Sequence, residues 1–445
     1  MQGISCLGSA LQAYQNRCLE TLHAALNRTL MYKAWRPFDP GEDAPVDARY
    51  AALPVLTKAD LRTHFPYGLV PRGLDLDAAL ARGEVSFVRT SGTADESLTN
   101  IWNQNWWNDS ERASWSLNAH AGRALTGTHR EAILASALSV GPRSAGPQIP
   151  REGRMLGRFL FLNEYGSPAE WPEGHEMRIC AELEEYSPVV LEANPSLLAR
   201  LARWAWREGK AVFQPRLITL TYEFPSTMQL RTIRRIFSSR IASSYGSTEA
   251  GYVFMECEHG RLHQNSAFCR VDLVAMDGLE GQGIGRILAT TFGNRWFPLL
   301  RFEIGDLARV SPDPCPCSRS FGLTLSCIEG RLISIFLGAG NRLVTHRQLD
   351  QVMAGVEGID EYRLDQESPK RVQLRLITAG NRPRQSVLRD AQETIHALLG
   401  DELEVTAEAV CCLLPEASGK FLLAKRHFPL DIGASPTRPG GLDGR

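Results

Sequence analysis

Apolar residues along this chain recur with two different periods. Over residues 8–30 they recur every three or four positions, which predicts an amphipathic helix. A second such helix is predicted over residues 196–209, where Pro195 precedes the first turn and Ser196 can cap it. Short strand-like runs, several of them separated by helical stretches, occur at Val85–Val88, Ala132–Leu138, Val189–Leu191, Leu217–Tyr222, Ile241–Tyr245 and Ile287–Thr291. This alternation predicts an α/β fold with substantial sheet content.

The C-terminal part of the chain has a different pattern. Residues 384–399 have helical spacing, and strand-like runs occur at Glu361–Asp365, Arg371–Thr378 and Glu402–Val410. This set predicts a small α+β unit of a size that folds alone. We therefore expect a large N-terminal domain over residues 1–331, with mixed sheets and helices, and a small domain over residues 332–432. The tail, residues 433–445, is predicted to be disordered.

Composition narrows the class of protein. Of the 445 residues, 43% are hydrophobic and 22% charged, which is typical of a soluble globular protein. The formal net charge is −1 and basic runs are absent, so neither a nucleic acid nor an anionic membrane is an expected partner. We find no secretory signal and no apolar run of membrane-spanning length, and we expect a cytoplasmic protein whose ten cysteines are mostly reduced.

Two hydroxyl-rich turns follow predicted strands. The first is the run 89–93, Arg-Thr-Ser-Gly-Thr, whose backbone N–H groups and hydroxyls suit an anion, although such a string is more often an ordinary turn. The second is the run 244–249, Ser-Tyr-Gly-Ser-Thr-Glu. Its Tyr ring could lie against a base, its Thr on a phosphate and its Glu on a magnesium ion, which favours carboxylates and phosphate oxygens. A tight turn with a solvated Glu is the alternative.

Two further segments carry single charged residues next to glycine. Asp306 follows Gly305 in the run 298–307, and its two oxygens could accept hydrogen bonds from both ribose hydroxyls. Lys420 follows Gly419 in Ser-Gly-Lys-Phe, and its charge could stabilise a developing phosphate oxyanion. Taken alone, each residue is more often a turn Asp or a solvated surface Lys.

In this order, the four segments resemble the adenylate-forming superfamily, specifically its phenylacetate–CoA ligase branch. The Tyr-Gly-x-Thr-Glu run at 245–249 and the Arg-x-x-x-Gly-Asp run at 301–306 are its specific signatures. The segment 53–66, which contains Leu-Pro-Val-Leu-Thr-Lys and ends in Phe-Pro, is similar to the entry segment of that branch. The resemblance covers nearly the whole chain.

The resemblance implies that a carboxylate attacks the α-phosphate of ATP and that a thiol, most simply that of CoA, then displaces AMP. It implies an aromatic or other hydrophobic acid as substrate, and a mobile C-terminal domain that closes over the large one. The catalytic residues implied are Thr248, Glu249 as the magnesium ligand, and Lys420. The nucleotide-binding residues implied are Thr90, Ser91, Gly92, Thr93, Glu223, Tyr245, Gly246, Ser247, Asp306 and Arg331.

The roles implied differ from residue to residue. Tyr245 stacks on adenine, Asp306 holds the ribose and Arg331 lies beside it. Thr248 bonds the α-phosphate, and Lys420 acts in the adenylation transition state.

Two positions depart from the family pattern. The phosphate loop continues with Asp95 and Glu96, where relatives carry a flexible Gly and a Lys, and two carboxylates repel a polyanion unless they turn away. The junction after Gly330 and Arg331 has Ser334 in the region where relatives carry a hinge Asp. An adenylating enzyme with another acceptor (an amine or a carrier-protein thiol) and a non-catalytic ligand-binding relative therefore remain alternatives.

Four candidate metal ligands lie just beyond the second and third segments. Cys257 and His259 form one pair, and Cys315 and Cys317 the other. Two such pairs supply the four ligands of a closed tetrahedral zinc site, and some relatives in the branch carry similar clusters. We predict a structural zinc there, with His263 as a less favoured substitute for His259. Buried free cysteines are the alternative. For the oligomeric state, a homodimer is the base-rate expectation.

Overall fold

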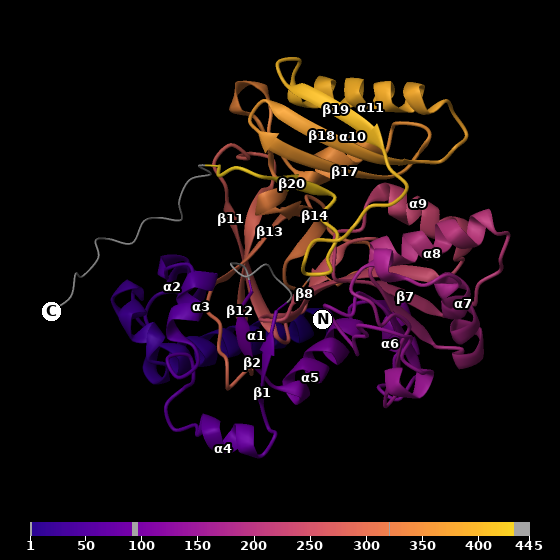
Figure 1. Cartoon of the computed structure of the whole chain (residues 1–445). Helices are drawn as coiled ribbons and strands as arrows, with labels where there is room; N and C mark the ends of the chain where they lie inside the picture. The colour runs from indigo at the N-terminus through magenta and orange to yellow at the C-terminus, as the bar shows by residue number, and fades with distance from the viewer. Residues whose placement is uncertain (1, 91–96, 320, 431–445) are drawn as a thin grey trace. The chain divides into compact units, whose positions relative to one another are not determined.

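A computed structural model of the chain describes residues 2–90, 97–319 and 321–430, and its elements are labelled in Figure 1. The α-helices are α1 (Gln2–Arg28), α2 (Val46–Ala52), α3 (Lys58–His64), α4 (Leu76–Ala81), α5 (Gln104–Trp115), α6 (Ala119–Ala124), α7 (His175–Tyr186), α8 (Pro195–Arg207), α9 (Thr227–Ile236), α10 (His346–Met353) and α11 (Arg384–Leu399). Single 3-10 turns are η1 (Met31–Phe38), η2 (Arg151–Arg154), η3 (Pro168–Glu170), η4 (Leu332–Ser334) and η5 (Ala339–Asn341).

The strands are β1 (Ser86–Arg89), β2 (Thr99–Trp102), β3 (Glu131–Leu134), β4 (Met155–Leu156), β5 (Phe159–Phe161), β6 (Val190–Ala193), β7 (Leu217–Leu220), β8 (Arg240–Ser247), β9 (Gly251–Glu256), β10 (Leu262–Gln264), β11 (Cys269–Ala275), β12 (Ile284–Thr291), β13 (Phe302–Val310), β14 (Thr324–Arg331), β15 (Phe336–Leu337), β16 (Leu343–Val344), β17 (Ile359–Ser368), β18 (Arg371–Thr378), β19 (Glu404–Ala409) and β20 (Ala424–Arg426). The predicted mixture of sheets and helices is confirmed. Every strand-like run named from the sequence overlaps a strand, and the predicted helix over 384–399 coincides with α11.

One detail of helix capping differs from the prediction. Asn194, and not Ser196, caps α8, because its side chain accepts the N–H groups of Ser196 and Leu197 while Pro195 fills the first helical position. The hydroxyl of Ser196 is thereby left to bond elsewhere, and it donates to Glu223.

Contacts divide the chain into two units, each built from separate segments. The first unit includes residues 2–118 and 245–327. Within it lie the strands β11, β12, β13, β14, β10 and β9, in that spatial order, and a separate antiparallel pair of β1 and β2. Helix α1 buries Cys18, Leu22 and Ala25, which recur at three- and four-residue spacing.

The second unit includes residues 119–244 and 328–430. Strands β8, β7, β6, β3 and β5 run parallel in that order, and β4 is added antiparallel at the edge. Helices α7, α8 and α9 contribute to the hydrophobic core of this sheet. A smaller sheet, in the order β19-β18-β17-β20, is covered by α11, as Figure 1 shows.

The two sheets of the second unit share side chains across their cores. Phe421, from the loop before β20, belongs to the core of the parallel sheet. Met228 of α9 in turn belongs to the core of the small sheet. The C-terminal segment thus packs on residues 119–244. The predicted boundary at residues 331 and 332 remains a prediction, and the tail predicted to be disordered lies outside the described residues.

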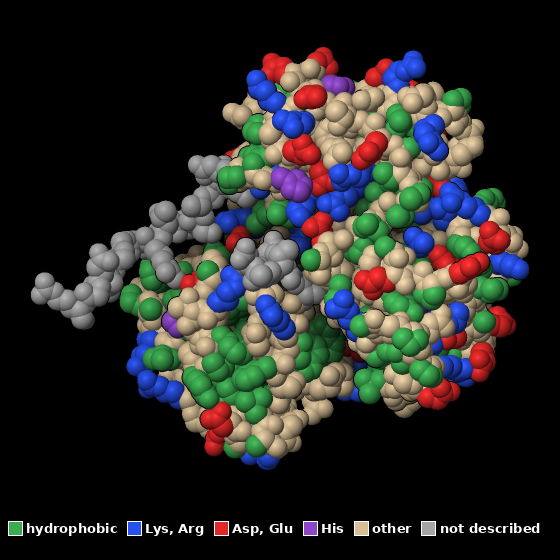
Figure 2. All heavy atoms as spheres, in the orientation of Figure 1, with side chains coloured by type: hydrophobic (Ala, Val, Ile, Leu, Met, Phe, Trp, Pro, Cys, Tyr) green, Lys and Arg blue, Asp and Glu red, His purple; other side chains and the backbone are tan. Residues whose placement is uncertain are grey.

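Charges of both signs are interspersed on the face drawn in Figure 2, as the small net charge leads one to expect. The nine cysteines whose side chains the structure describes, which are all but Cys6, are free thiols. Among the described residues, no helix is both long enough and apolar enough to cross a bilayer.

Candidate active site

The second predicted segment lies where β8 ends in the first unit. Tyr245, Gly246 and Ser247 close the strand, and Thr248 and Glu249 follow in a turn that leads to β9. A side chain at position 246 would meet the backbone of Gly251 and Tyr252, with its Cβ 3.1 Å from the Gly251 carbonyl carbon. Only glycine therefore fits at this position. Glu249 is buried, with 6% of its surface exposed.

The third segment meets the second within the same unit. Asp306 lies on β13, directly after Gly305, whose φ of +99° favours glycine. The hydroxyl of Tyr245 donates a hydrogen bond of 2.8 Å to Oδ2 of Asp306. Two residues predicted to bind one nucleotide therefore touch, although 61 positions separate them.

The first segment is described only at its N-terminal end, Arg89 and Thr90. The N–H of Thr90 donates to the carbonyl of Leu98 at 2.8 Å, and the Leu98 N–H donates to the Thr90 hydroxyl at 2.8 Å. This pairing continues the β1–β2 ladder by one step. The predicted phosphate ligands Ser91, Gly92 and Thr93, together with Asp95 and Glu96, lie outside the described residues.

The fourth segment is a tight turn in the second unit. The Glu416 N–H donates to the Lys420 carbonyl, and the Gly419 N–H donates to the Glu416 carbonyl, both at 2.8 Å. The Glu416 carboxylate accepts from Arg363 and Lys425, each at 2.7 Å. Hydrogen bonds within the turn therefore hold the backbone of Lys420, and the Glu416 carboxylate holds the turn itself.

Gly419 is the point where this turn meets the parallel sheet. Its φ is +78°, and a Cβ built there would lie 2.8 Å from Cβ of Ser136 and 2.9 Å from Cβ of Leu138. Both values are shorter than real Cβ contacts, so glycine is required for conformation and for space.

Glu223 lies beside this turn. Its Oε1 accepts the backbone N–H of Phe421, and its Oε2 accepts the hydroxyl of Ser196 at 2.9 Å. Burial raises the pKa of Glu223 to about 7, against the opposing effects of its hydrogen bonds and of the Lys420 charge. The structure thus brings Glu223 and Lys420 together.

Arg331 ends β14, immediately after Gly330. The φ of Gly330 is +118°, and a Cβ there would lie 2.6 Å from Cβ of His346. Ser334, in the region where relatives carry a hinge Asp, is buried in the turn η4. The junction therefore has a glycine that the packing requires.

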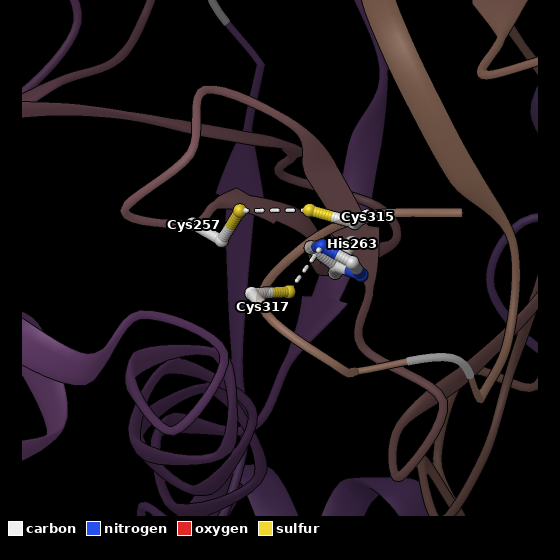
Figure 3. Close-up of side chains that lie close together, drawn as sticks. All are labelled: Cys257, His263, Cys315 and Cys317. Atoms are coloured by element: carbon white, nitrogen blue, oxygen red, sulfur yellow. Dashed lines mark hydrogen bonds between the residues drawn. The ribbon is translucent and has the colours of Figure 1, made fainter. Parts of the chain in front are cut away.

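The candidate metal ligands converge in the first unit, with one substitution in the predicted set. Figure 3 shows Cys257, His263, Cys315 and Cys317 facing one another, and their ligand atoms all lie within 4.8 Å of one another. Sγ of Cys257 is 3.6 Å from Sγ of Cys315, and Sγ of Cys317 is 3.2 Å from Nε2 of His263. His259 is not part of the cluster.

The geometry of a hairpin explains the substitution. β9 and β10 pair antiparallel with Leu262 opposite Glu256, so side chains at 261 and 263 point to the same face as Cys257. His259 lies in the exposed turn, where its backbone N–H donates to Sγ of Cys257 at 3.4 Å. Counting strand alternation from a turn at Gly260 would have found His263 in the sequence.

The pKa shifts of His263 and Cys317 favour metal binding, whereas that of Cys257 opposes it. Burial lowers the pKa of His263, which favours the neutral imidazole that binds metals. Burial opposes a thiolate at Cys317, yet the backbone N–H of Arg319 and the neighbouring Cys315 thiol lower its pKa overall. Burial raises the pKa of Cys257 to about 11, so that this thiol needs a cation to ionise.

Three tryptophans close in sequence, Trp102 on β2 and Trp106 and Trp107 on α5, have different environments. Trp102 and Trp107 stack with ring centroids 4.4 Å apart, and Trp107 lies 5.0 Å from the ring of Tyr252. Trp106 instead packs against Gly251, and its indole N–H donates to the carbonyl of Phe292 at 2.8 Å. Trp106 is therefore a packing residue, while the other two rings form a half-buried aromatic group.

Comparisons with known proteins identify the class of structures that share this fold. Neither a protein-family profile nor a curated protein sequence matches the chain. Solved structures do match, and they define the fold as that of the adenylate-forming CoA ligases. This confirms the predicted fold, whereas the phenylacetate–CoA ligase branch remains a prediction.

Three of these structures illustrate the likeness. A 2-hydroxyisobutyryl-CoA ligase in the post-adenylation state, bound to its acyl-AMP, aligns over 90% of this chain and 86% of its own, with a TM-score of 0.66 and 17% identity. The same ligase in an open conformation with acyl-AMP and CoA aligns over 93% and 90%, with a TM-score of 0.55 and 18% identity. The anthranilate CoA ligase AuaEII, bound to anthranoyl-AMP, aligns over 76% and 66%, with a TM-score of 0.52 and 13% identity.

Proposed function

We propose that this protein activates a carboxylic acid with ATP to an acyl-adenylate and then transfers the acyl group to CoA. The observation that carries the proposal is the contact between Tyr245 and Asp306. It joins two segments that were each predicted to hold the same nucleotide, in a fold whose solved examples include CoA ligases bound to acyl-AMP. Those ligands belong to the other proteins and support the proposal by analogy.

The proposed role of each site residue follows from the chemistry of its side chain. The Tyr245 ring covers adenine and the Asp306 carboxylate accepts from the ribose, with Arg331 beside it. Thr248 and the run 90–93 contact phosphate oxygens. When bound, ATP supplies an electrophilic α-phosphate and a pyrophosphate leaving group.

The charge that builds during the reaction needs cationic partners. Glu249 is proposed to hold the magnesium ion that accompanies ATP, because carboxylates and phosphate oxygens are the usual ligands of that ion. Lys420 neutralises the oxygens as the carboxylate meets the α-phosphate. Gly246 and Ser247 shape the turn that carries Thr248 and Glu249.

The acid is proposed to be aromatic or otherwise hydrophobic. The stacked rings of Trp102 and Trp107, extended by Tyr252, offer a half-buried aromatic surface in the unit that carries Tyr245 and Asp306. Aromatic rings pack favourably against such groups. A screen of aromatic and aliphatic acids tests this choice directly.

Pyrophosphate release with ATP, magnesium and a panel of acids tests the proposed activation step. Adding CoA then tests the second step, which should release AMP and form a thioester. Pyrophosphate without a thioester would favour the alternative of an amine or a carrier-protein thiol as acceptor. No pyrophosphate with any acid, despite ATP binding, would favour a ligand-binding relative.

A zinc ion held by Cys257, His263, Cys315 and Cys317 is proposed as a structural clip. With Zn–S bonds near 2.3 Å, a tetrahedral site has ligand atoms about 3.8 Å apart. The observed separations of 3.6 and 3.2 Å, with all four atoms within 4.8 Å, fit that size. The clip would join the β9–β10 hairpin to the loop after β13.

A further inference from the structure

A continuous series of hydrogen bonds connects the Lys420 turn to the interior of the second unit. Glu223 accepts the N–H of Phe421, the residue directly after Lys420, and accepts the Ser196 hydroxyl at 2.9 Å. The Ser196 oxygen in turn accepts from Nε2 of Gln229 at 2.9 Å. This hydroxyl thus donates its single proton to Glu223 and accepts one hydrogen bond from Gln229.

The series continues from Gln229 into the small sheet. Nε2 of Gln229 also donates to Oε1 of Glu361 on β17 at 3.0 Å, and Nη2 of Arg203 on α8 donates to Oε2 of Glu361 at 2.9 Å. Oε1 of Gln229 accepts the N–H of Ser226 at 3.0 Å, so the orientation of the amide is fixed. The chemistry of these groups therefore determines which atom donates and which accepts in each bond of the series.

Because its members are buried, breaking this series of hydrogen bonds has a high free-energy cost. Gln229 has no exposed surface, and Ser196 and Glu361 each expose 4%. A buried polar group that loses its partner bears its desolvation cost without compensation. Water cannot substitute readily at these depths, so the series transmits position from α8, α9 and β17 to Glu223.

The turn is also held by packing on its other side. The Phe421 ring lies in the core of the parallel sheet, and Gly419 lies against Ser136 and Leu138. Lys420 stands between these two anchors. Its backbone can move only if the Glu223 contact or the core packing moves.

We infer that Glu223 is a positioning residue that sets the place of Lys420 through the Phe421 N–H, and that Ser196, Gln229 and Glu361 hold Glu223 in place. This inference rests on the proposed function, because it gives Lys420 its role in adenylation. It gives Glu223 a role that differs from the nucleotide contact implied by the resemblance. A nucleotide contact would alter ATP affinity, whereas a positioning role alters the rate of the step that uses Lys420.

The test compares Glu223→Ala, Glu223→Gln and Lys420→Ala in both half-reactions. Glu223→Ala should lower kcat for pyrophosphate release roughly 10²-fold, the usual cost of a misplaced group, with KM for ATP nearly unchanged. Formation of thioester from supplied acyl-adenylate and CoA should stay within about threefold of the wild type, a difference of less than 1 kcal/mol in barrier height. Glu223→Gln keeps an acceptor for the Phe421 N–H and should restore most of the rate.

A matched pair on α9 separates positioning from general loosening. Gln229→Met removes the bonds to Ser196 and Glu361 and also the acceptor of the Ser226 N–H. Thr227→Val removes the 2.6 Å bond from the Thr227 hydroxyl to Asp350, outside the series and in the same first turn of α9. Gln229→Met should slow pyrophosphate release selectively, and Thr227→Val should leave the ratio of the two half-reactions unchanged.

Several outcomes would overturn the inference. They are a Glu223→Ala protein with normal adenylation, one with only a raised KM for ATP, one equally slow in both half-reactions, or equal behaviour of the α9 pair. If Lys420→Ala itself adenylates normally, the proposed role of Lys420 fails first. That result is distinguishable, because it appears in the reference variant.

Discussion

Tyr245 and Asp306, 61 residues apart, are joined by a hydrogen bond of 2.8 Å from the tyrosine hydroxyl to Oδ2 of the carboxylate. The bond engages the Tyr245 hydroxyl and one oxygen of the Asp306 carboxylate, and it holds the ring beside the carboxylate. A single contact thus orients a carboxylate suited to a ribose beside a ring suited to a base.

Removing the Asp306 carboxylate should weaken ATP binding by about 1–3 kcal/mol, because ribose hydroxyls lose their acceptor. Tyr245→Phe is the matched variant, since it keeps the ring and loses the hydroxyl that donates to Asp306. It should cost about 1 kcal/mol. Calorimetric titration of ATP measures both, and unchanged affinity in Asp306→Ala would remove the residue from the nucleotide site.

Lys420→Ala should lower pyrophosphate release about 10²–10³-fold, because a preorganised charge is lost where negative charge develops. Transfer from supplied acyl-adenylate to CoA should be nearly unaffected. Lys370→Ala is a suitable control, since this lysine is exposed in the turn between β17 and β18 and is not assigned to the reaction. Equal behaviour of the two variants would mean that Lys420 is an ordinary surface lysine.

Gly419→Ala should misplace the Lys420 turn, since the added methyl overlaps Ser136 and Leu138. We expect roughly 10²-fold slower pyrophosphate release. Gly380→Ala carries a similar backbone penalty, at φ +80°, with open space around the new Cβ. If the two variants release pyrophosphate at the same rate, the backbone penalty that they share, and not the overlap with Ser136 and Leu138, sets that rate.

The metal cluster yields a paired test. Protein purified without added metal should contain one zinc per chain by elemental analysis, and His263→Ala should lose it while His259→Ala keeps it, because only the first side chain faces the three sulfurs. The zinc-free variant should also unfold at lower denaturant concentration. Metal retained in His263→Ala and lost in His259→Ala would restore the ligand set predicted from sequence spacing.

Glu223 should make stability depend on pH. Its pKa is raised from 4.5 to about 7, so between these values folded protein binds a proton that the unfolded chain has released. Stability therefore falls as pH rises through that window. Glu223→Gln removes this loss and should gain at least about 1 kcal/mol on the wild type between pH 5 and pH 8, measured by urea unfolding.

Glu416 supplies a control of opposite sign. Burial opposes its charge, but Lys425 and Arg363 hold its pKa below the ordinary value. Its contribution to stability is present at neutral pH and lost in acid, so Glu416→Gln should lose more stability at pH 8 than in acid below the ordinary Glu pKa. The same pH trend in both variants would contradict the assignment for Glu223.

Local features of this protein could be predicted from the sequence because they depend on neighbours along the chain. Helical spacing places α11 at Arg384–Leu399, and the run Arg371–Thr378 is β18. The glycine turns that carry Asp306 and Lys420 are legible for the same reason, since a positive φ is a property of one residue. The order of the motifs was sufficient to predict the fold.

Tertiary structure decided which of these features meet. Ser196 was predicted to cap α8, but Asn194 caps the helix. The Ser196 hydroxyl instead donates to Glu223, because the loop after β7 lies beside the start of α8. His263 replaces His259 because the alternation of a hairpin, and not sequence distance, determines the facing side chain. The Gln229–Glu361 bond spans 132 residues, and no local pattern encodes a contact that exists only when α9 packs against β17.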